Sequence, residues 1–332
     1  AQAADWRRAA LLGWLFGLAH FTTGNTWIAT AFTYQAEMPA ALGWVAVPML
    51  SLYLAVYPAI GAALARLLAP RDRDWGLILA FAASWIVSEW LRSWVFTGFA
   101  WNPFGIVLLG GFRSPGLAML SPWLGTYAMS GLAVLLSGAL LMAWRKKAWL
   151  PAAAGFAAVA AIMLMPIGRG AEGKIAFTLV QPDIRQDRLN DPASFEEHFA
   201  RTARLSRPRA EGQQRLVLWP ESGVPDYLRD GYPQGFYNHM AANGDPAYAR
   251  ARIGRVIGAG SMLMTGAVDL EIKGGNAVGA YNAVTVIDHA GAIRGAYAKA
   301  HLVPYGEYLA LRWLLEPLGA ARLVAGSIDF LP

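Results

Sequence analysis

Five long apolar runs in the first half of the chain limit most strongly what it can fold into. The runs cover residues 10–31, 42–68, 75–96, 117–144 and 148–167. Each has the roughly 20 mostly apolar residues that a helix needs to cross the hydrocarbon core of a bilayer. The whole chain is 56% hydrophobic and only 15% charged, which is less charge than a soluble protein of this size carries. We therefore predict a helical membrane domain of about five spans over residues 1–168.

The basic residues of this half lie in alternate connections between the apolar runs. They are Arg7, Arg8, Arg66, Arg71, Arg73, Arg145, Lys146 and Lys147. By contrast, residues 32–41 contain no lysine or arginine, and residues 97–115 contain only Arg113. Cytoplasmic loops are enriched in lysine and arginine, so five spans that start inside place the second half of the chain outside the cytoplasm. The same placement accounts for the net charge of +6 without a nucleic-acid partner.

Two opposite charges, Glu89 and Arg92, fall in or at the end of the third apolar run. Charges within a membrane are costly and usually pair or face a cavity. Residues three apart meet on one face of a helix. We expect either an ion pair that orients this helix or a polar floor beneath a lipid-binding cleft.

Residues 169–332 have the composition of an ordinary globular domain. The predicted elements are strands at 175–180, 216–219 and 257–268, helices at 191–205 and 245–256, and a hairpin at 281–288 and 293–299. Asp191 followed by Pro192 favours a helix start, because aspartate caps a helix and proline fits its first position. The alternation of strands and helices predicts a layered α/β domain with a central sheet. There is no cysteine and no H-E-x-x-H pair, so we expect no disulfide, no thiolate metal site and no H-E-x-x-H zinc site.

Two charged residues follow predicted strands in this domain, Glu221 and Lys299. Strand ends of layered α/β folds gather reactive side chains at one edge of the sheet. A carboxylate there suits a general base, and an ammonium group suits stabilisation of an oxyanion. Taken singly, each residue equally fits a solvated strand end. Ser222 lacks a G-x-S-x-G elbow, which disfavours a serine nucleophile.

Two motifs resemble the carbon–nitrogen hydrolase, or nitrilase, superfamily. Leu218-Trp-Pro-Glu-Ser-Gly223 is similar to its first catalytic segment, and Tyr297-Ala-Lys-Ala-His-Leu-Val-Pro-Tyr-Gly-Glu307 is similar to its second. The resemblance implies that Glu221 is the catalytic glutamate, that Lys299 is the catalytic lysine and that Glu307 supports the lysine. It also implies a nitrilase-like α-β-β-α sandwich, incomplete at its C-terminus, over residues 169–332.

A nitrilase-like domain behind a multi-span membrane domain resembles one family, the apolipoprotein N-acyltransferases of the bacterial inner membrane. Val180-Gln-Pro-Asp-Ile184 and residues 85–101 resemble further segments of this family. The resemblance implies a multi-pass membrane protein with its catalytic domain on the periplasmic side. A cysteine thiolate would take an acyl chain from a phospholipid, and the thioester would pass it to the N-terminal amine of a diacylglyceryl-cysteine lipoprotein. No cofactor is implied.

This chain departs from the family pattern in three ways. It contains no cysteine to act as nucleophile, Asn190 stands where the family has a tryptophan, and we expect one or two N-terminal spans of the family to be missing. We therefore expect a chain truncated at both ends and inactive alone. Two rival functions share its features: a membrane-tethered amide or nitrile hydrolase that uses water as acceptor, and a non-catalytic membrane module.

Overall fold

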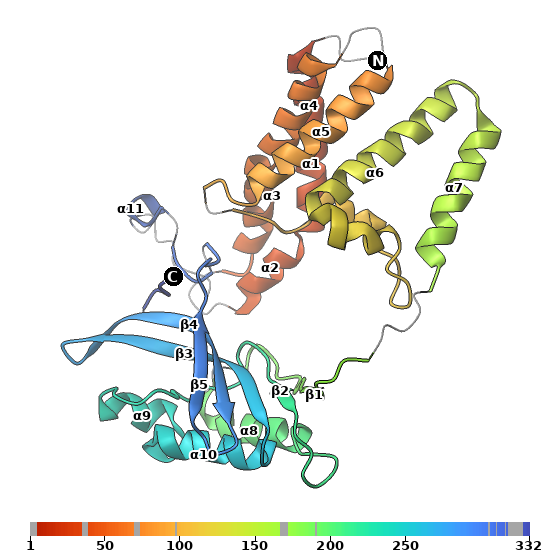
Figure 1. Ribbon diagram of the computed structural model, residues 1–332. Coiled ribbons are helices and arrows are strands. Elements are labelled where there is room, and N and C mark those ends of the chain that lie inside the picture. Colours follow the sequence, from red (N-terminus) through yellow and green to blue (C-terminus); the bar gives the residue numbers. More distant parts are fainter. Residues whose placement is uncertain are drawn as a thin grey trace. The chain divides into compact units, whose positions relative to one another are not determined.

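The computed structural model of the protein describes residues 5–34, 39–69, 74–96, 98–166, 172–189, 191–304, 306–309, 311–315, 317 and 328–332. Its contacts divide the chain into two compact units (Figure 1). We call Ala1–Gly170 the helical unit and Ala171–Pro332 the sheet unit. Arg71, Arg73, Asn190 and the predicted domain boundary at residue 168 lie outside the described residues.

The helical unit is built from helices that pack against one another. Its α-helices are α1 (Trp6–Gly24), α2 (Trp27–Ala31), α3 (Leu42–Leu54), α4 (Val56–Leu68), α5 (Asp74–Arg92), α6 (Ser121–Arg145) and α7 (Trp149–Leu164). Short 3-10 helices lie at Phe32–Tyr34, Phe104–Leu108 and Leu117–Leu120. α4 packs against both α1 and α5, and α5 packs against α6. The break between α3 and α4 falls at Ala55, where Pro58 has no N–H to donate to the carbonyl of Leu54.

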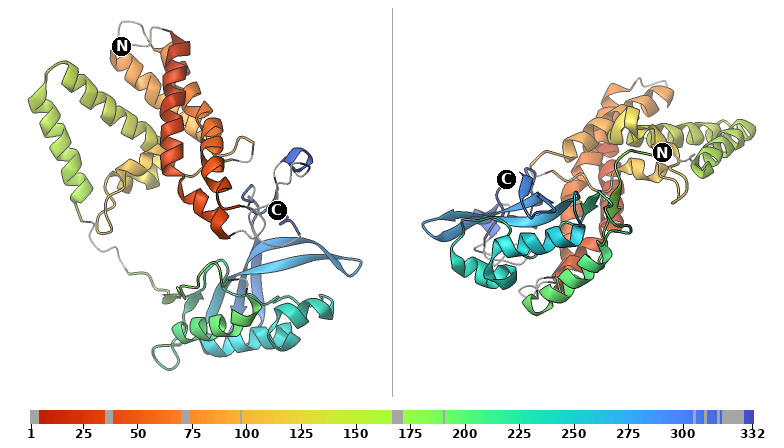
Figure 2. Two further views of the ribbon diagram at one scale, coloured as in Figure 1. Left: turned by 180° about the vertical axis from the view of Figure 1, so that it is seen from behind. Right: turned by 60° about the horizontal axis from the view of Figure 1, so that its bottom comes forward.

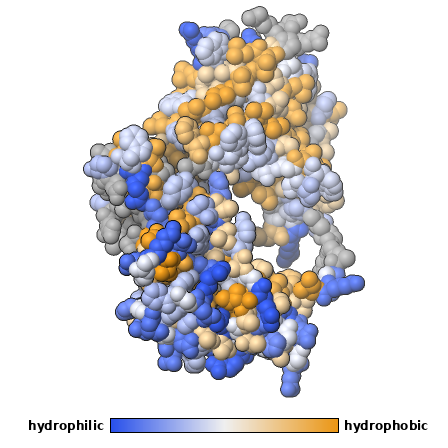
Figure 3. Space-filling view, turned by 60° about the vertical axis from the view of Figure 1, so that its left-hand side comes forward, coloured by the Kyte–Doolittle hydropathy of each residue, from blue (hydrophilic) through white to orange (hydrophobic). Residues whose placement is uncertain are grey.

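The helical unit carries much of its apolar surface on the outside. Among the residues that the structure describes, two helical segments are long and apolar enough to cross a membrane, Leu42–Leu68 and Leu117–Arg145. α7 is also apolar but shorter, and it buries none of its side chains. Apolar side chains cover much of the visible face of this unit (Figure 3). The predicted helical character is confirmed, together with two apolar segments; the five-span membrane domain stays a prediction.

The sheet unit is built on a mixed five-stranded sheet in the order β1-β2-β3-β4-β5. Its strands are β1 (Phe177–Leu179), β2 (Leu216–Leu218), β3 (Met262–Lys273), β4 (Asn276–Asp288) and β5 (Ile293–Ala298). The first three strands run parallel, and β4 and β5 are antiparallel to their neighbours. Its helices are α8 (Phe195–Leu205), α9 (Gln234–Met240), α10 (Pro246–Ile257) and α11 (Arg312–Leu315). Helices α8, α9 and α10 lie on one face of the sheet (Figures 1 and 2).

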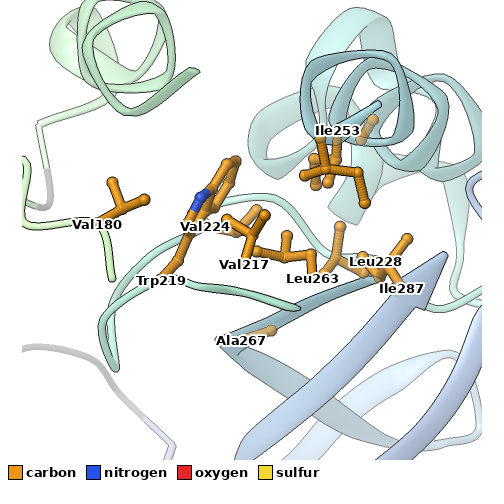
Figure 4. Packing of buried hydrophobic residues seen from close by; sticks show 11 residues of the cluster. Val180, Val217, Trp219, Val224, Leu228, Ile253, Leu263, Ala267 and Ile287 are labelled. Atoms are coloured by element: carbon orange, nitrogen blue, oxygen red, sulfur yellow. The ribbon is translucent and has the colours of Figure 1, made fainter. Parts of the chain in front are cut away.

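The core of the sheet unit lies between the sheet and this helical layer. Val217 of β2 and Leu263 of β3 are fully buried there and pack with Ile253 of α10 (Figure 4). Side chains alternate between the two faces of a strand, so the next residues, Leu218 and Met264, belong to the opposite face. Both of these residues line a pocket on that face.

Most predicted elements of this unit are present, with shifted ends. The side chain of Asp191 accepts the N–H of Ala193 at 3.1 Å, which caps the helical segment as expected. The layered α/β domain with a central sheet is confirmed in the form of a mixed sheet. The prediction missed the length of β4, which extends back to Asn276 and pairs with β3. Gly274 and Gly275 make this turn with φ values of 58° and 82°, which glycine adopts readily.

Candidate functional site

Glu221 lies at the carboxyl end of β2, where the chain continues alongside β3. The N–H of Trp219 donates to the carbonyl of Met264 at 3.0 Å, and the N–H of Gly266 donates to the carbonyl of Pro220 at 3.2 Å. The backbone of Glu221 lies so close to Gly266 that a Cβ at this position would collide with it. Because Gly266 has no side chain, the backbone of Glu221 can lie directly against β3.

Lys299 lies directly after β5 and stays aligned with β4. Its N–H donates to the carbonyl of Asn282 at 2.8 Å. Its Nζ lies 3.0 Å from Oε1 and 2.9 Å from Oε2 of Glu307. An ammonium group has three donor hydrogens, so one remains for a ligand after both oxygens of Glu307 are engaged.

Glu307 is the most enclosed of the predicted site residues, with its side chain 8% exposed. Its Oε2 accepts the N–H of Val303 at 2.7 Å, and its own N–H donates back to the carbonyl of Val303 at 2.8 Å. Burial raises the pKa of the Glu307 carboxyl, but hydrogen bonds from Asn282, Val303 and Lys299 outweigh this effect and hold that pKa below its ordinary value. The carboxylate is thus kept ionised beside the ammonium of Lys299.

Asn282 of β4 joins the two carboxylates of the site. Its Nδ2 donates to Oε1 of Glu221 at 2.7 Å and to Oε1 of Glu307 at 2.8 Å. The structure therefore brings all three predicted site residues, Glu221, Lys299 and Glu307, into one hydrogen-bonded group. Sequence reasoning missed Asn282, although an amide within the otherwise mostly apolar run 281–287 was a visible signal.

A pocket of about 570 Å³ lies beside this group, on the sheet face opposite the helical layer. Glu221, Asn282 and Lys299 line it together with apolar side chains from neighbouring strands. The apolar and aromatic lining includes Leu218, Trp219, Met264, Val284 and Tyr297. The pocket thus combines a base, a cation and an apolar wall. Among the described residues, no group of three or more His, Cys, Asp or Glu side chains is arranged to hold a metal ion.

The helical unit contains a buried polar group of its own. Arg92 lies 3.7 Å from Glu89, and both side chains are at most 5% exposed. Glu89 accepts the N–H of Phe104 at 2.8 Å and the hydroxyl of Ser130. Arg92 donates to the carbonyl of Trp101 at 2.7 Å. The predicted ion pair is therefore present, and it fixes the loop after α5 to helices α5 and α6.

Residues 1–139 match the protein family described as "Apolipoprotein N-acyltransferase N-terminal domain". Three curated relatives carry the name apolipoprotein N-acyltransferase. The protein from Rhodopseudomonas palustris is 32% identical over 345 residues, which is 97% of this chain and 60% of the relative. Those from Bradyrhizobium diazoefficiens and Sinorhizobium medicae are 36% and 33% identical over 95% and 96% of this chain. They are covered over 58% and 59% of their own length, so the chain spans about three fifths of each relative.

Proposed function

We propose that this chain, which is similar to the apolipoprotein N-acyltransferases over nearly its whole length, belongs to a protein that N-acylates lipoproteins at the Glu221–Lys299 pocket. The acceptor would be the N-terminal amine of a diacylglyceryl-cysteine lipoprotein, and the donor a phospholipid. The observation that carries the proposal is the hydrogen-bonded group in which Asn282 joins Glu221 to Glu307 and Glu307 holds Lys299. A base and a cation at one pocket are what acyl transfer needs.

The proposed reaction has two steps that share one thioester. A thiolate attacks the ester carbonyl of the phospholipid, and the lysophospholipid alcohol leaves with a proton. The amine of the acceptor then attacks the thioester carbonyl, an amide bond forms, and the thiol is released. The chain itself contains no cysteine, so the sulfur would come from outside these 332 residues. The 332 residues alone would therefore not catalyse the reaction.

Each site residue has a distinct proposed role. Glu221 takes the proton of the thiol and later that of the amine. Lys299 offers its remaining donor hydrogen to the oxyanion of each tetrahedral intermediate. Loss of one such interaction typically costs about 3–4 kcal/mol, or roughly a hundred- to thousand-fold in rate. Glu307 and Asn282 position these two groups.

The same proposal places the protein in the bacterial inner membrane, with several spans and with the sheet unit on the periplasmic side. Support comes from the two long apolar segments, from α7 with no buried side chain, and from the alternation of basic loops. We further propose that the sheet unit is part of a nitrilase-like α-β-β-α sandwich. In this sandwich, the face of the sheet opposite α8, α9 and α10 would pack against a second sheet.

The test is N-acylation by the gene product that carries this chain, read as the mass shift of a lipoprotein N-terminal peptide. Glu221→Gln and Lys299→Met should each lower the rate at least about a hundred-fold while the protein still folds. Glu271→Gln, on the β3–β4 hairpin outside the pocket, is the matched control and should leave the rate unchanged. Ordinary rates in either of the first two variants would refute the assignment.

A further inference from the structure

The sheet unit has a second pocket, of about 640 Å³, where the C-terminal ends of α8 and α10 meet. Four arginines line it, Arg207, Arg209, Arg252 and Arg255, against a single acidic side chain, Glu211. The pocket belongs to the helical layer, whereas the Glu221–Lys299 pocket lies on the opposite face of the sheet. The two sites are therefore separate, and ligand binding at the second pocket does not depend on acyl transfer.

One of the four arginines is already neutralised and held in place. Arg252 lies 3.0 and 2.8 Å from the two carboxylate oxygens of Glu196. Its guanidinium also stacks on the ring of Phe199, 3.5 Å from the ring centroid. Arg252 and Phe199 therefore form one wall of the pocket. The charge of Arg252 is balanced by Glu196.

The other three arginines make no ion pair with any carboxylate in the described part of the chain. Arg255 lies in the last turn of α10, where the helix dipole favours a cation. The helix dipole does not explain Arg207 and Arg209 in the same way, because Arg215 already places a positive charge at the C-terminal end of α8. Arg215 is 6% exposed, and its guanidinium donates to the carbonyl of Ser206, the C-cap of α8.

Arg207 and Arg209 thus add positive charge that neither a carboxylate nor a helix end balances. Like charges gathered in a pocket repel one another, and an anion bound between them relieves that repulsion. The planar guanidinium fork matches the oxygens of a phosphate group in a bidentate arrangement. Phe199, Pro208 and Val256 add apolar surface beside the charges, which suits an organic phosphate.

We propose that this arginine pocket binds a phosphate group, carried either by a small soluble phosphate or by the headgroup of an anionic phospholipid. Arg207 and Arg209 make the direct contacts, and Arg255 contributes charge from the side of α10. Both sources present the same oxyanion, so the chemistry of recognition is shared. A binding experiment with two arms distinguishes the two sources.

The chain is reconstituted in bilayer discs of phosphatidylcholine with and without phosphatidylglycerol, and inorganic phosphate is titrated into each sample by calorimetry. Saturable binding of phosphate in both kinds of disc identifies a small soluble ligand. Binding of phosphate only in the discs without phosphatidylglycerol identifies the lipid headgroup, which then occupies the pocket. In either arm, Arg207→Gln together with Arg209→Gln should weaken binding about tenfold or more, because each removes charge-assisted hydrogen bonds.

Arg201→Gln is the matched control, because Arg201 is an exposed arginine of α8 that does not line the pocket. Combined with Arg204→Gln, at another exposed arginine of α8 outside the pocket, it removes the same two charges as the double variant and should leave binding unchanged. No binding in either arm, or equal losses in the control and the double variant, would overturn the proposal. The side chains of Arg207 and Arg209 are exposed, so the double variant should fold, and circular dichroism of the double variant and of the control checks this.

Discussion

The backbone N–H of Lys299 donates to the carbonyl of Asn282 at 2.8 Å, which makes the two residues cross-strand neighbours. Residues opposite each other on antiparallel strands point to the same face of the sheet. Both side chains consequently reach Glu307, the lysine at 3.0 Å and the amide at 2.8 Å. The site is thus assembled by strand pairing, and its members are expected to respond together when one is changed.

Asn282→Ala should lower the proposed acyl transfer about 10- to 100-fold, because hydrogen bonds to charged groups contribute about 1.5–3 kcal/mol. The variant removes the donor shared by Glu221 and Glu307 without touching a reacting atom. A positioning role predicts that the pH–rate profile shifts as well, since Glu307 loses a hydrogen bond that lowers the pKa of its carboxyl. A lower rate with an unchanged profile would point to a merely structural role.

Glu307→Gln should make stability respond differently to pH. The folded-state pKa of Glu307 lies below its ordinary value of 4.5, so the carboxylate stabilises the fold above that pH. This contribution is lost as the pH falls through the lowered folded-state pKa. The variant should therefore unfold at lower urea concentration than the parent near pH 7, and the gap should close toward low pH. A gap that keeps the same size down to low pH would contradict this prediction.

Gly266→Ala should destabilise the sheet unit by about 1–3 kcal/mol, as expected when a methyl group is forced into a filled site. The new Cβ would collide with the backbone of Glu221. Gly295→Ala on β5 provides the comparison, because nothing lies within 4 Å of a Cβ placed there. Urea unfolding of both variants checks the difference, and equal stabilities would show that the contact at Gly266 relaxes freely.

Topology can be measured cleanly because the chain has no cysteine of its own. Asp187→Cys, at a side chain that is 48% exposed in the sheet unit, should react with a membrane-impermeant maleimide in intact cells. Lys146→Cys, in the basic connection between α6 and α7, should react only after lysis. The reverse pattern would place the sheet unit in the cytoplasm and overturn the proposed orientation.

The sequence predicted the parts of the site that depend on local signals. The Trp-Pro-Glu run after an apolar strand placed Glu221 at a strand end, and the hairpin before Lys299 placed the lysine at another. Asn282 escaped because its role depends on the register of β4 against β5, which shifts between Val286 and Ile287. No local pattern specifies such a shift. The continuation of β4 back to Asn276 is a separate miss, because that part of β4 pairs with β3 and not with β5.

Glu307 and Glu221 differ in how many hydrogen bonds their carboxylate oxygens accept. A carboxylate offers about four lone-pair positions. Around Glu307, Asn282 and Lys299 approach Oε1, while Val303 and Lys299 approach Oε2, so its lone pairs are saturated. Glu221 receives one hydrogen bond, from Asn282, within the described part of the chain. Of two chemically identical groups only a few ångströms apart, Glu221 alone keeps lone pairs to spare.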